Sequence, residues 1–414
     1  MTLSVSELRE KFHQPGPTEL ELIARYAMLP EDPQRARAFE AFAASGLPHR
    51  RQEAWKWSDF RRALPTLAAT QQDRALSPSI FPDSIEIKLS AQGFQLPDQL
   101  PEGVKLHLRS APQALADAED APLASLTAAL AGRVGGPDML IIEVTGKVDH
   151  PLHILCQGDQ DETNFARIAV VVRPEASLNL WESHLGGAGF SSYLIEADLH
   201  PGAEFHRTVF QRGRADEVQA ATALVNLNAA ANYTQTQLAF GAKLARLETR
   251  LRHQATGSQA TLNGAYLCAD TYHVDMTSHV RHGAPSCVTR QIIKGAVLNG
   301  GTGVFQGKFH VPRTIGQFTD ADMQHQALLL EEGAVVFAKP ELEIYADDVE
   351  CAHGNTSGAL DESQLFYMRQ RGISLQEARA LLTEAFIAEA FEAREDDIQS
   401  ALRHAAQAFL SGGQ

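Results

Sequence analysis

From Met139 to about residue 360, short β-like segments follow one another with no long helical pattern between them. The segments are rich in β-branched residues or alternate apolar and charged residues with period two, which is typical of strands. Clear examples are MLIIEV, RIAVVV, AEFHRTVF, ARLETRLR and ELEIYA. A parallel α/β sheet requires a long crossover, usually a helix, between successive strands. The run therefore excludes that class and predicts a mainly β fold.

Pairs of Gly and Ala recur between these segments at irregular spacing, at Gly202-Ala203, Gly241-Ala242, Gly283-Ala284 and Gly333-Ala334. Short strands joined by such turns could close as a sandwich, a barrel or a β-helix. A β-helix tolerates irregular spacing because each coil has to match only its neighbours. The pattern alone leaves the β-helix and the sandwich equally open.

Before this run the sequence predicts short helices. Thr18 followed by Glu21 fits a capping box, and Asp32 fits an N-cap with proline at the first helical position. Proline-rich sequence and one alanine-rich helical stretch follow. We therefore predict an N-terminal helical region and connector over 1–136, and a β core over 137–360.

After the β core the pattern returns to helix over 361–414. Ser374 and Glu377 form a second capping box. Apolar residues recur there at helical spacing. Such helices usually pack on their own domain, but a projecting pair can equally be a docking arm, and an exposed apolar face marks a partner surface. We predict this partner-binding face at Phe366, Tyr367, Leu381, Leu382 and Phe386.

The charge balance limits the kind of partner. With 36 basic and 51 acidic residues the net charge is −15, which repels phosphate backbones and anionic lipid headgroups. A basic segment around Trp55 and Trp57 could bind nucleic acid by stacking, but the acidic remainder favours an intramolecular anchor. No apolar run approaches the roughly 20 residues of a membrane-spanning helix, and the first residues do not resemble a signal peptide. These observations predict a cytoplasmic protein with no nucleic-acid or membrane partner.

The segment KPELEIYADDVECAHGNTSG places Cys351 and His353 two residues apart. On a strand both side chains project from one face, about 6–7 Å apart. They could hold a soft or borderline metal, or act as a nucleophile and its base. Alternatively, Cys351 is a buried small hydrophobe and His353 caps the following turn.

A self-contained site at this segment lacks residues. Iron–sulfur clusters and structural zinc generally take four protein ligands, and the segment offers two. A metal bound here would therefore be shared with another chain or held transiently. The sequence also contains no Gly-x-Ser-x-Gly, Gly-x-Gly-x-x-Gly or His-Glu-x-x-His motif, and no third residue that would orient the pair for catalysis can be identified.

A second candidate cluster is TYHVDMTSHVRHG, which holds His273, His279 and His282 together with Asp275. His273 and Asp275 share strand parity, and the three histidines need not all face one way. A functional role for any of these histidines and polar stacking on the surface both stay open.

Two motifs resemble one known family. The sequence from Lys339 to Phe386, KPELEIYADDVECAHGNTSGALDESQLFYMRQRGISLQEARALLTEAF, resembles the C-terminal signature of the SufB/SufD proteins of iron–sulfur cluster assembly. GLPHRRQEAWKWSDF resembles their N-terminal motif. The length of the chain and its Cys-x-His-Gly turn are similar to the shorter, SufD-like form. One departure is MQHQA at residues 323–327, where the family commonly shows asparagine-rich sequence.

The resemblance implies a right-handed parallel β-helix flanked by N-terminal and C-terminal helical regions, and a subunit without catalysis of its own. Such a subunit pairs with a SufB-like paralogue, or with a second copy in isolation, and carries a SufC-like ATPase on its C-terminal helices. His353, with Cys351 beside it, would be a ligand that is shared with the partner for a transient iron–sulfur cluster, and flavin binding stays open. The alternatives are a SufB-like subunit that binds the cluster itself and a β-helix enzyme that uses Cys351 and His353.

Overall fold

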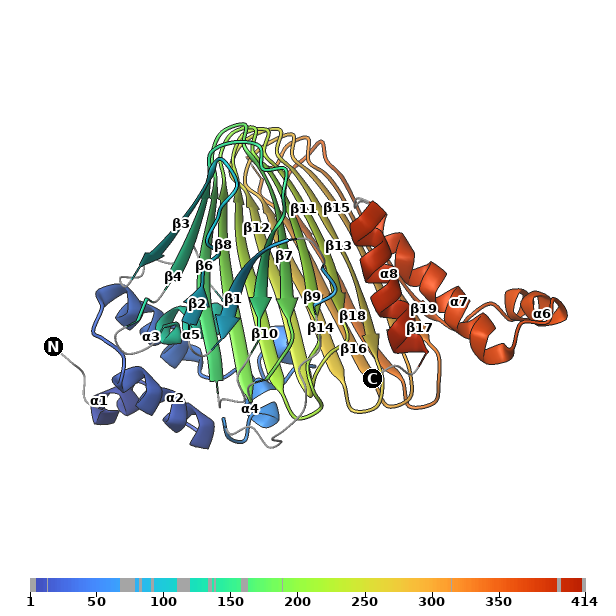
Figure 1. The fold of residues 1–414 in the computed structure, drawn as a ribbon, viewed down its shortest axis with the longest axis horizontal. Helices are drawn as coiled ribbons and strands as arrows, with labels where there is room; N and C mark the ends of the chain where they lie inside the picture. Colours follow the sequence, from blue (N-terminus) through green and yellow to red (C-terminus); the bar gives the residue numbers. More distant parts are fainter. Residues whose placement is uncertain are drawn as a thin grey trace.

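The computed structural model is a parallel β-solenoid with helices at both ends of the chain (Figure 1). From β4 onward the strands alternate between two sheets, so each strand from β6 to β17 pairs with the strands two places before and after it. Neighbouring strands of these coils are parallel. The β-helix implied by the resemblance is confirmed, and the sandwich left open by the strand pattern is wrong. The structure describes residues 5–12, 14–67, 79–81, 84–90, 93–109, 120–132, 136–137, 139–157, 163–187, 189–313, 315–392 and 396–411.

Sheet A contains, in spatial order, β19 (Glu350–Gly358), β17 (Asp320–Leu329), β15 (Val288–Val297), β13 (Gln259–Cys268), β11 (Asn232–Ala239), β9 (Glu204–Gln211), β7 (Ser177–His184), β5 (Leu152–Cys156), β1 (Ile85–Ser90) and β2 (Gly93–Gln95). Sheet B contains β18 (Val335–Ile344), β16 (Thr302–Val311), β14 (His273–His282), β12 (Leu244–His253), β10 (Val218–Leu227), β8 (Phe190–Leu199), β6 (Thr163–Val172), β4 (Met139–Val144) and β3 (Val104–Arg109). β1, β2 and β3 lie within the segment expected to be a connector. At this N-terminal end each sheet finishes in an antiparallel strand, β2 beside β1 and β3 beside β4.

The interior of the solenoid is filled by side chains that point inward from both sheets. One inward row of sheet A runs through Leu178, Phe205, Tyr233 and Ala260, all buried in a single core cluster. Several corners need glycine, because Gly202, Gly241 and Gly333 have φ angles of 68°, 88° and 82°. The glycines at these predicted turns are therefore explained by the positive φ angles of the backbone there.

The N-terminal helices are α1 (Val5–Glu10), α2 (Pro17–Ala27), α3 (Pro33–Ser45), η1 (Glu53–Trp55), α4 (Phe60–Ala63) and α5 (Pro122–Leu130). Asp32 caps α3 as expected, accepting hydrogen bonds from two backbone N–H groups. The capping box expected at Thr18 is wrong, because α2 starts earlier and the Glu19 carboxylate accepts the Gly16 N–H at 2.6 Å. Thr18 instead donates to the carbonyl of Leu64.

The C-terminal helices are α6 (Glu362–Gln370), α7 (Leu375–Ala388), η2 (Glu389–Phe391) and α8 (Asp396–Leu410). Ser374 caps α7 by accepting the Glu377 N–H, as the sequence predicts. α8 lies against sheet A, where Phe409 stacks on Phe240 with ring centroids 4.8 Å apart. Figure 1 shows α6 and the adjoining end of α7 extending away from the solenoid. Among the described residues no helix is long and apolar enough to cross a membrane.

Candidate metal site at the open end of the solenoid

At the C-terminal end of the solenoid both sheets stop on strands that pair on one side only within the described chain. β18 is the last strand of sheet B and β19 is the last strand of sheet A. Most residues of β19 are exposed, because no further coil covers them. Unpaired backbone N–H and C=O groups of this kind are a template for strand addition.

Cys351 and His353 lie on β19 and face the interior side of the solenoid. Their register partners on β17 are Ala321 and Met323, and both partners are buried in the interior core. Cys351 is half-buried and contacts this core, whereas His353 is exposed. The two side chains therefore share one face at the mouth of the solenoid, as strand parity predicts.

The pair offers donor atoms that suit a metal, and its two side chains do not contact each other as a nucleophile and its base would. Burial, followed by the charge of Asp320, raises the pKa of the Cys351 thiol, so the thiolate that both a nucleophile and a metal ligand require is disfavoured. Cys351 packs on the interior core while His353 is exposed, and no hydrogen bond between them is found among the described residues. Sulfur and imidazole nitrogen suit iron, copper or zinc. Among the described residues, however, no three His, Cys, Asp or Glu side chains group closely enough to hold a metal.

A buried polar chain that the sequence analysis missed lies directly under this mouth. His325 is fully buried, bonds Tyr266 Oη through Nε2 at 2.9 Å and bonds Asn355 Oδ1 through Nδ1 at 2.7 Å. Its ring stacks on Phe305 at 4.7 Å. Burial lowers the pKa of His325 to about 4. His325 belongs to the MQHQA segment, where the family resemblance predicts asparagine side chains. In this chain an imidazole packed between aromatic rings takes the place of such an amide.

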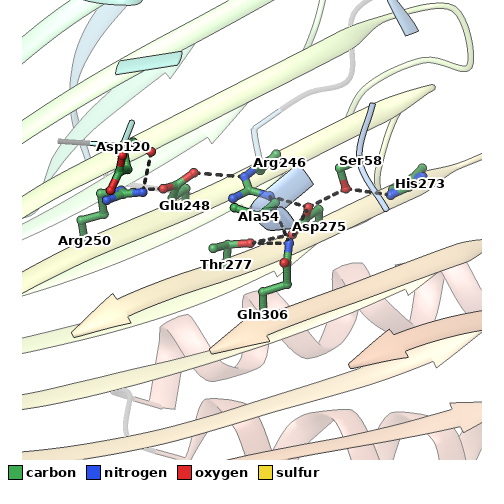
Figure 2. Close-up of polar contacts among 10 residues, drawn as sticks. All are labelled: Ala54, Ser58, Asp120, Arg246, Glu248, Arg250, His273, Asp275, Thr277 and Gln306. Atoms are coloured by element: carbon green, nitrogen blue, oxygen red, sulfur yellow. Dashed lines mark hydrogen bonds and ion pairs between the residues drawn. The ribbon is translucent and has the colours of Figure 1, made fainter. Parts of the chain in front are cut away.

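The three histidines of TYHVDMTSHVRHG lie in three different surroundings. His273 Nε2 is 3.2 Å from Ser58 Oγ in the polar network of Figure 2. His279 lies in register between Arg250 and Lys308 on the outer face of sheet B. His282 points inward and stacks on His253 with ring centroids 4.8 Å apart. The structure therefore does not bring these histidines together as a ligand set.

The network of Figure 2 joins the Trp55 segment to the outer face of sheet B. Arg246 lies between Glu248 and Asp275, at 3.0 and 2.7 Å, and its guanidinium lies 3.8 Å from the centre of the Trp55 ring. Ser58 donates to Asp275 at 2.5 Å. These contacts agree with an intramolecular anchor for the basic, tryptophan-containing segment.

The anchor also reaches the last strand of sheet B. Trp57 stacks on Phe337 of β18 at 5.4 Å, and Glu53 accepts from Lys339 at 2.7 Å. Beside it lies a cavity of about 430 Å³. Its basic Lys308 and Lys339 already pair with acidic residues that line the same cavity. The lining as a whole holds four carboxylates and three Lys or Arg cations, so its charges nearly balance.

The predicted partner-binding face is divided between solvent and the solenoid. Phe366, Tyr367 and Leu381 are 64%, 59% and 38% exposed. Phe386 instead lies on the Nζ of Lys294 at 4.4 Å and packs against the apolar cluster under α8. Leu382 is half-buried. The exposed part of this face is therefore at α6 and the first half of α7.

Comparison with known proteins points to a single family. Residues 154–386 match the family model described as "SUF system FeS cluster assembly, SufBD core domain". The chain is 27% identical over 399 residues to the iron–sulfur cluster assembly protein SufD of Escherichia coli strain K12, covering 88% of this chain and 89% of that protein. It is 26% identical over 426 residues to the SufBD family protein slr0076 of Synechocystis, covering 92% and 93%. Protein ABCI7 of Arabidopsis thaliana chloroplasts is 28% identical over 274 residues, covering 63% of this chain and 58% of that protein.

Proposed function

This chain belongs to the SufBD family of the SUF system for iron–sulfur cluster assembly, and from that membership we propose that it is a non-catalytic, SufD-like subunit of an assembly complex. The observation that carries the proposal is the coincidence of three features at one end of the solenoid. Within the described chain, sheet A and sheet B both end there on strands that pair on one side only, and Cys351 and His353 face the same mouth. A partner that adds strands to these edges would meet both side chains.

The partner that fits this end is a SufB-like paralogue with open strands of its own. Main-chain hydrogen bonds across β18 and β19 would continue the two sheets into the partner. β18 contains Pro340, which lacks an N–H, so β19 offers the more complete hydrogen-bonding edge. In the absence of the paralogue, a second copy of this chain can occupy the same edges as a homodimer.

The cluster is the cargo of this site. His353 can supply an imidazole nitrogen and Cys351 a thiolate, which is half of a four-ligand set. The remaining ligands would come from the partner subunit or from the sulfide of the cluster. Because burial raises the pKa of the Cys351 thiol, metal binding has to displace its proton.

The exposed apolar residues of α6 and α7 fit the docking of a SufC-like ATPase. Phe366, Tyr367 and Leu381 stand on helices that extend away from the solenoid (Figure 1). Exposed aromatic residues on a helix face are typical anchors of protein interfaces. An ATPase bound to this arm would contact helices that stand away from the body of the solenoid, while the paralogue would pair with the strand edges.

Affinity purification of the tagged chain from its native cell tests the proposal. We expect it to co-purify with a longer paralogue and an ATPase subunit, and the complex to take up iron and acid-labile sulfide. Recovery of a lone monomer under gentle conditions would contradict the proposed complex. Hydrolytic turnover by the isolated chain, lost on alkylation of Cys351, would support the Cys–His enzyme instead. Placement of the complex in the cytoplasm stays a prediction, since the relatives come from bacteria and from a chloroplast.

A further inference from the structure

Three side chains form a hydrogen-bonded chain from the interior of the solenoid to its mouth. Tyr266 on β13 bonds His325 on β17, and His325 bonds Asn355 on β19. Asn355 follows Cys351 and His353 by four and two residues on the same strand, so all three side chains lie on the inward face. Asn355 is exposed at the mouth, while Tyr266 and His325 are fully buried.

The direction of each hydrogen bond follows from the groups available. Within the described structure the buried Tyr266 hydroxyl has no other acceptor, so its O–H donates to Nε2 of His325. A neutral imidazole that accepts at Nε2 carries its proton on Nδ1. Nδ1–H therefore donates to the Oδ1 of Asn355. The Oδ1 of Asn355 is thus occupied, and its NH₂ group can donate hydrogen bonds at the mouth.

Glycines fix the buried end of this chain. A Cβ at Gly295 would lie 2.2 Å from the Cζ of Tyr266, and a Cβ at Gly303 would lie 2.3 Å from its Cε2. The Tyr266 ring therefore occupies a slot that only glycine leaves open. Phe305 covers one face of the His325 ring with an interplanar angle of 5°. Neither ring can turn without moving the core.

We propose that Asn355 donates N–H hydrogen bonds to sulfur bound at the mouth, the sulfide of a cluster held at His353 and Cys351. His325 and Tyr266 are the positioning residues that keep the amide in this orientation. The inference rests on the proposed function, because it takes the cargo of that site to be sulfide-containing. N–H donors beside cluster sulfur stabilise the reduced, more negative state and raise the reduction potential.

The orientation is tested first on the full chain without metal. With ¹⁵N-labelled histidine, NMR should show the Nδ1–H tautomer for His325. Asn355→Leu removes the acceptor and Tyr266→Phe removes the donor, and each should shift His325 toward the Nε2–H tautomer. Thr356→Val is the matched control, because Thr356 points outward on the same strand, and it should leave the His325 signals unchanged. An Nε2–H tautomer in the unaltered chain would overturn the proposed direction.

The donor role is tested on the assembled complex after cluster reconstitution. Asn355→Leu should lower the midpoint potential of the cluster with little change in iron content, and Tyr266→Phe should lower it by a smaller amount. Equal potentials in the unaltered, Asn355→Leu and Tyr266→Phe complexes would overturn the inference and leave the proposed function standing. A complex that takes up no cluster at all would contradict the proposed function itself. If Asn355→Leu does not fold, the midpoint potential of the Tyr266→Phe complex, in which only one oxygen is removed, is compared with that of the unaltered complex.

Discussion

His353 lies over Met323 in the parallel register of β19 and β17. Met323 is fully buried, whereas His353 is exposed, because β19 has no further coil beyond it. The same inward row thus provides core packing along the solenoid and a free imidazole at its last strand. A residue in this position can be replaced at little cost to folding, which makes its chemical role measurable.

We expect His353→Ala to leave folding and complex assembly nearly unchanged, since an exposed imidazole contributes roughly 0.5 kcal/mol or less to stability. Cluster formation on the complex should fall sharply if His353 is a ligand as proposed, because one of the two proposed ligands from this chain is then lost. Iron and acid-labile sulfide per complex are the measurement, with the ATPase subunit quantified alongside. Cys351→Ser should have a milder effect. Normal cluster content in an intact His353→Ala complex would make this subunit a purely structural component.

Phe366→Asp combined with Leu381→Asp should abolish binding of the ATPase subunit. Both side chains are exposed on the arm, so the β-rich circular dichroism spectrum and the unfolding midpoint should stay as they are. Phe386→Asp is the informative contrast. Phe386 contacts Lys294 and the apolar side chains packed beneath α8, so its replacement should also lower thermal stability. Loss of the whole fold in the double variant would show that α6 and α7 are part of the core.

Arg246→Met should destabilise the chain by about 3–5 kcal/mol, the usual cost of leaving buried carboxylates without their cation. Arg246, Glu248 and Asp275 are all buried, and removing the guanidinium leaves Asp275 with hydroxyl and amide partners only. Arg281→Met, on the exposed surface of β14, is the matched control and should cost roughly 0.5 kcal/mol or less. Denaturant unfolding of both variants gives the comparison. Equal losses would mean that the buried network does not anchor the N-terminal segment.

Stability should decrease as the pH falls below about 6.5. Burial lowers the pKa of four histidines to about 4, so the unfolded chain binds more protons than the folded chain between these two values. Each such histidine adds a slope of up to about 1.4 kcal/mol per pH unit. The four are His153, His279, His282 and His325.

Denaturant midpoints at pH 7, 6 and 5 measure this slope. His325→Gln removes one of the buried titrating groups, so its stability should depend less steeply on pH than that of the unaltered chain. Below about pH 4.5 a further loss is expected from Glu182. Burial would raise the pKa of that carboxyl, but Arg207 and His184 lower it to about 2. A flat stability profile between pH 7 and 5 would contradict this account.

The strand pattern predicted a mainly β fold, but it could not separate a β-helix from a sandwich. Alternation along a strand shows that two faces exist, not whether the neighbouring strand is parallel. The motif resemblance supplied that choice. The ends of the helices were predictable only in part, because a box such as Thr18 with Glu21 fits several starting points and the contact of Thr18 with Leu64 is not local.

The site was predictable only as far as it is local in sequence. Cys351 and His353 share a strand, so parity places them on one face. His325 and Asn355 are 30 residues apart, and Tyr266 is 59 residues from His325. Their meeting depends on the number of residues in each coil. The signal that could have found them is the recurrence of polar residues at a spacing of about one coil.

The two ends of the solenoid are unequal. The N-terminal end finishes in short antiparallel strands, and β3 carries exposed Lys105, His107 and Arg109 along its length. Charged edges of this kind resist strand addition. In sheet B, growth by edge pairing is therefore disfavoured at the N-terminal end, and two molecules paired through their C-terminal ends would offer a third only this charged edge. Such a polarity would make association through the edge of sheet B stop at a pair, and would guard a long, regular β structure against polymerising into fibres.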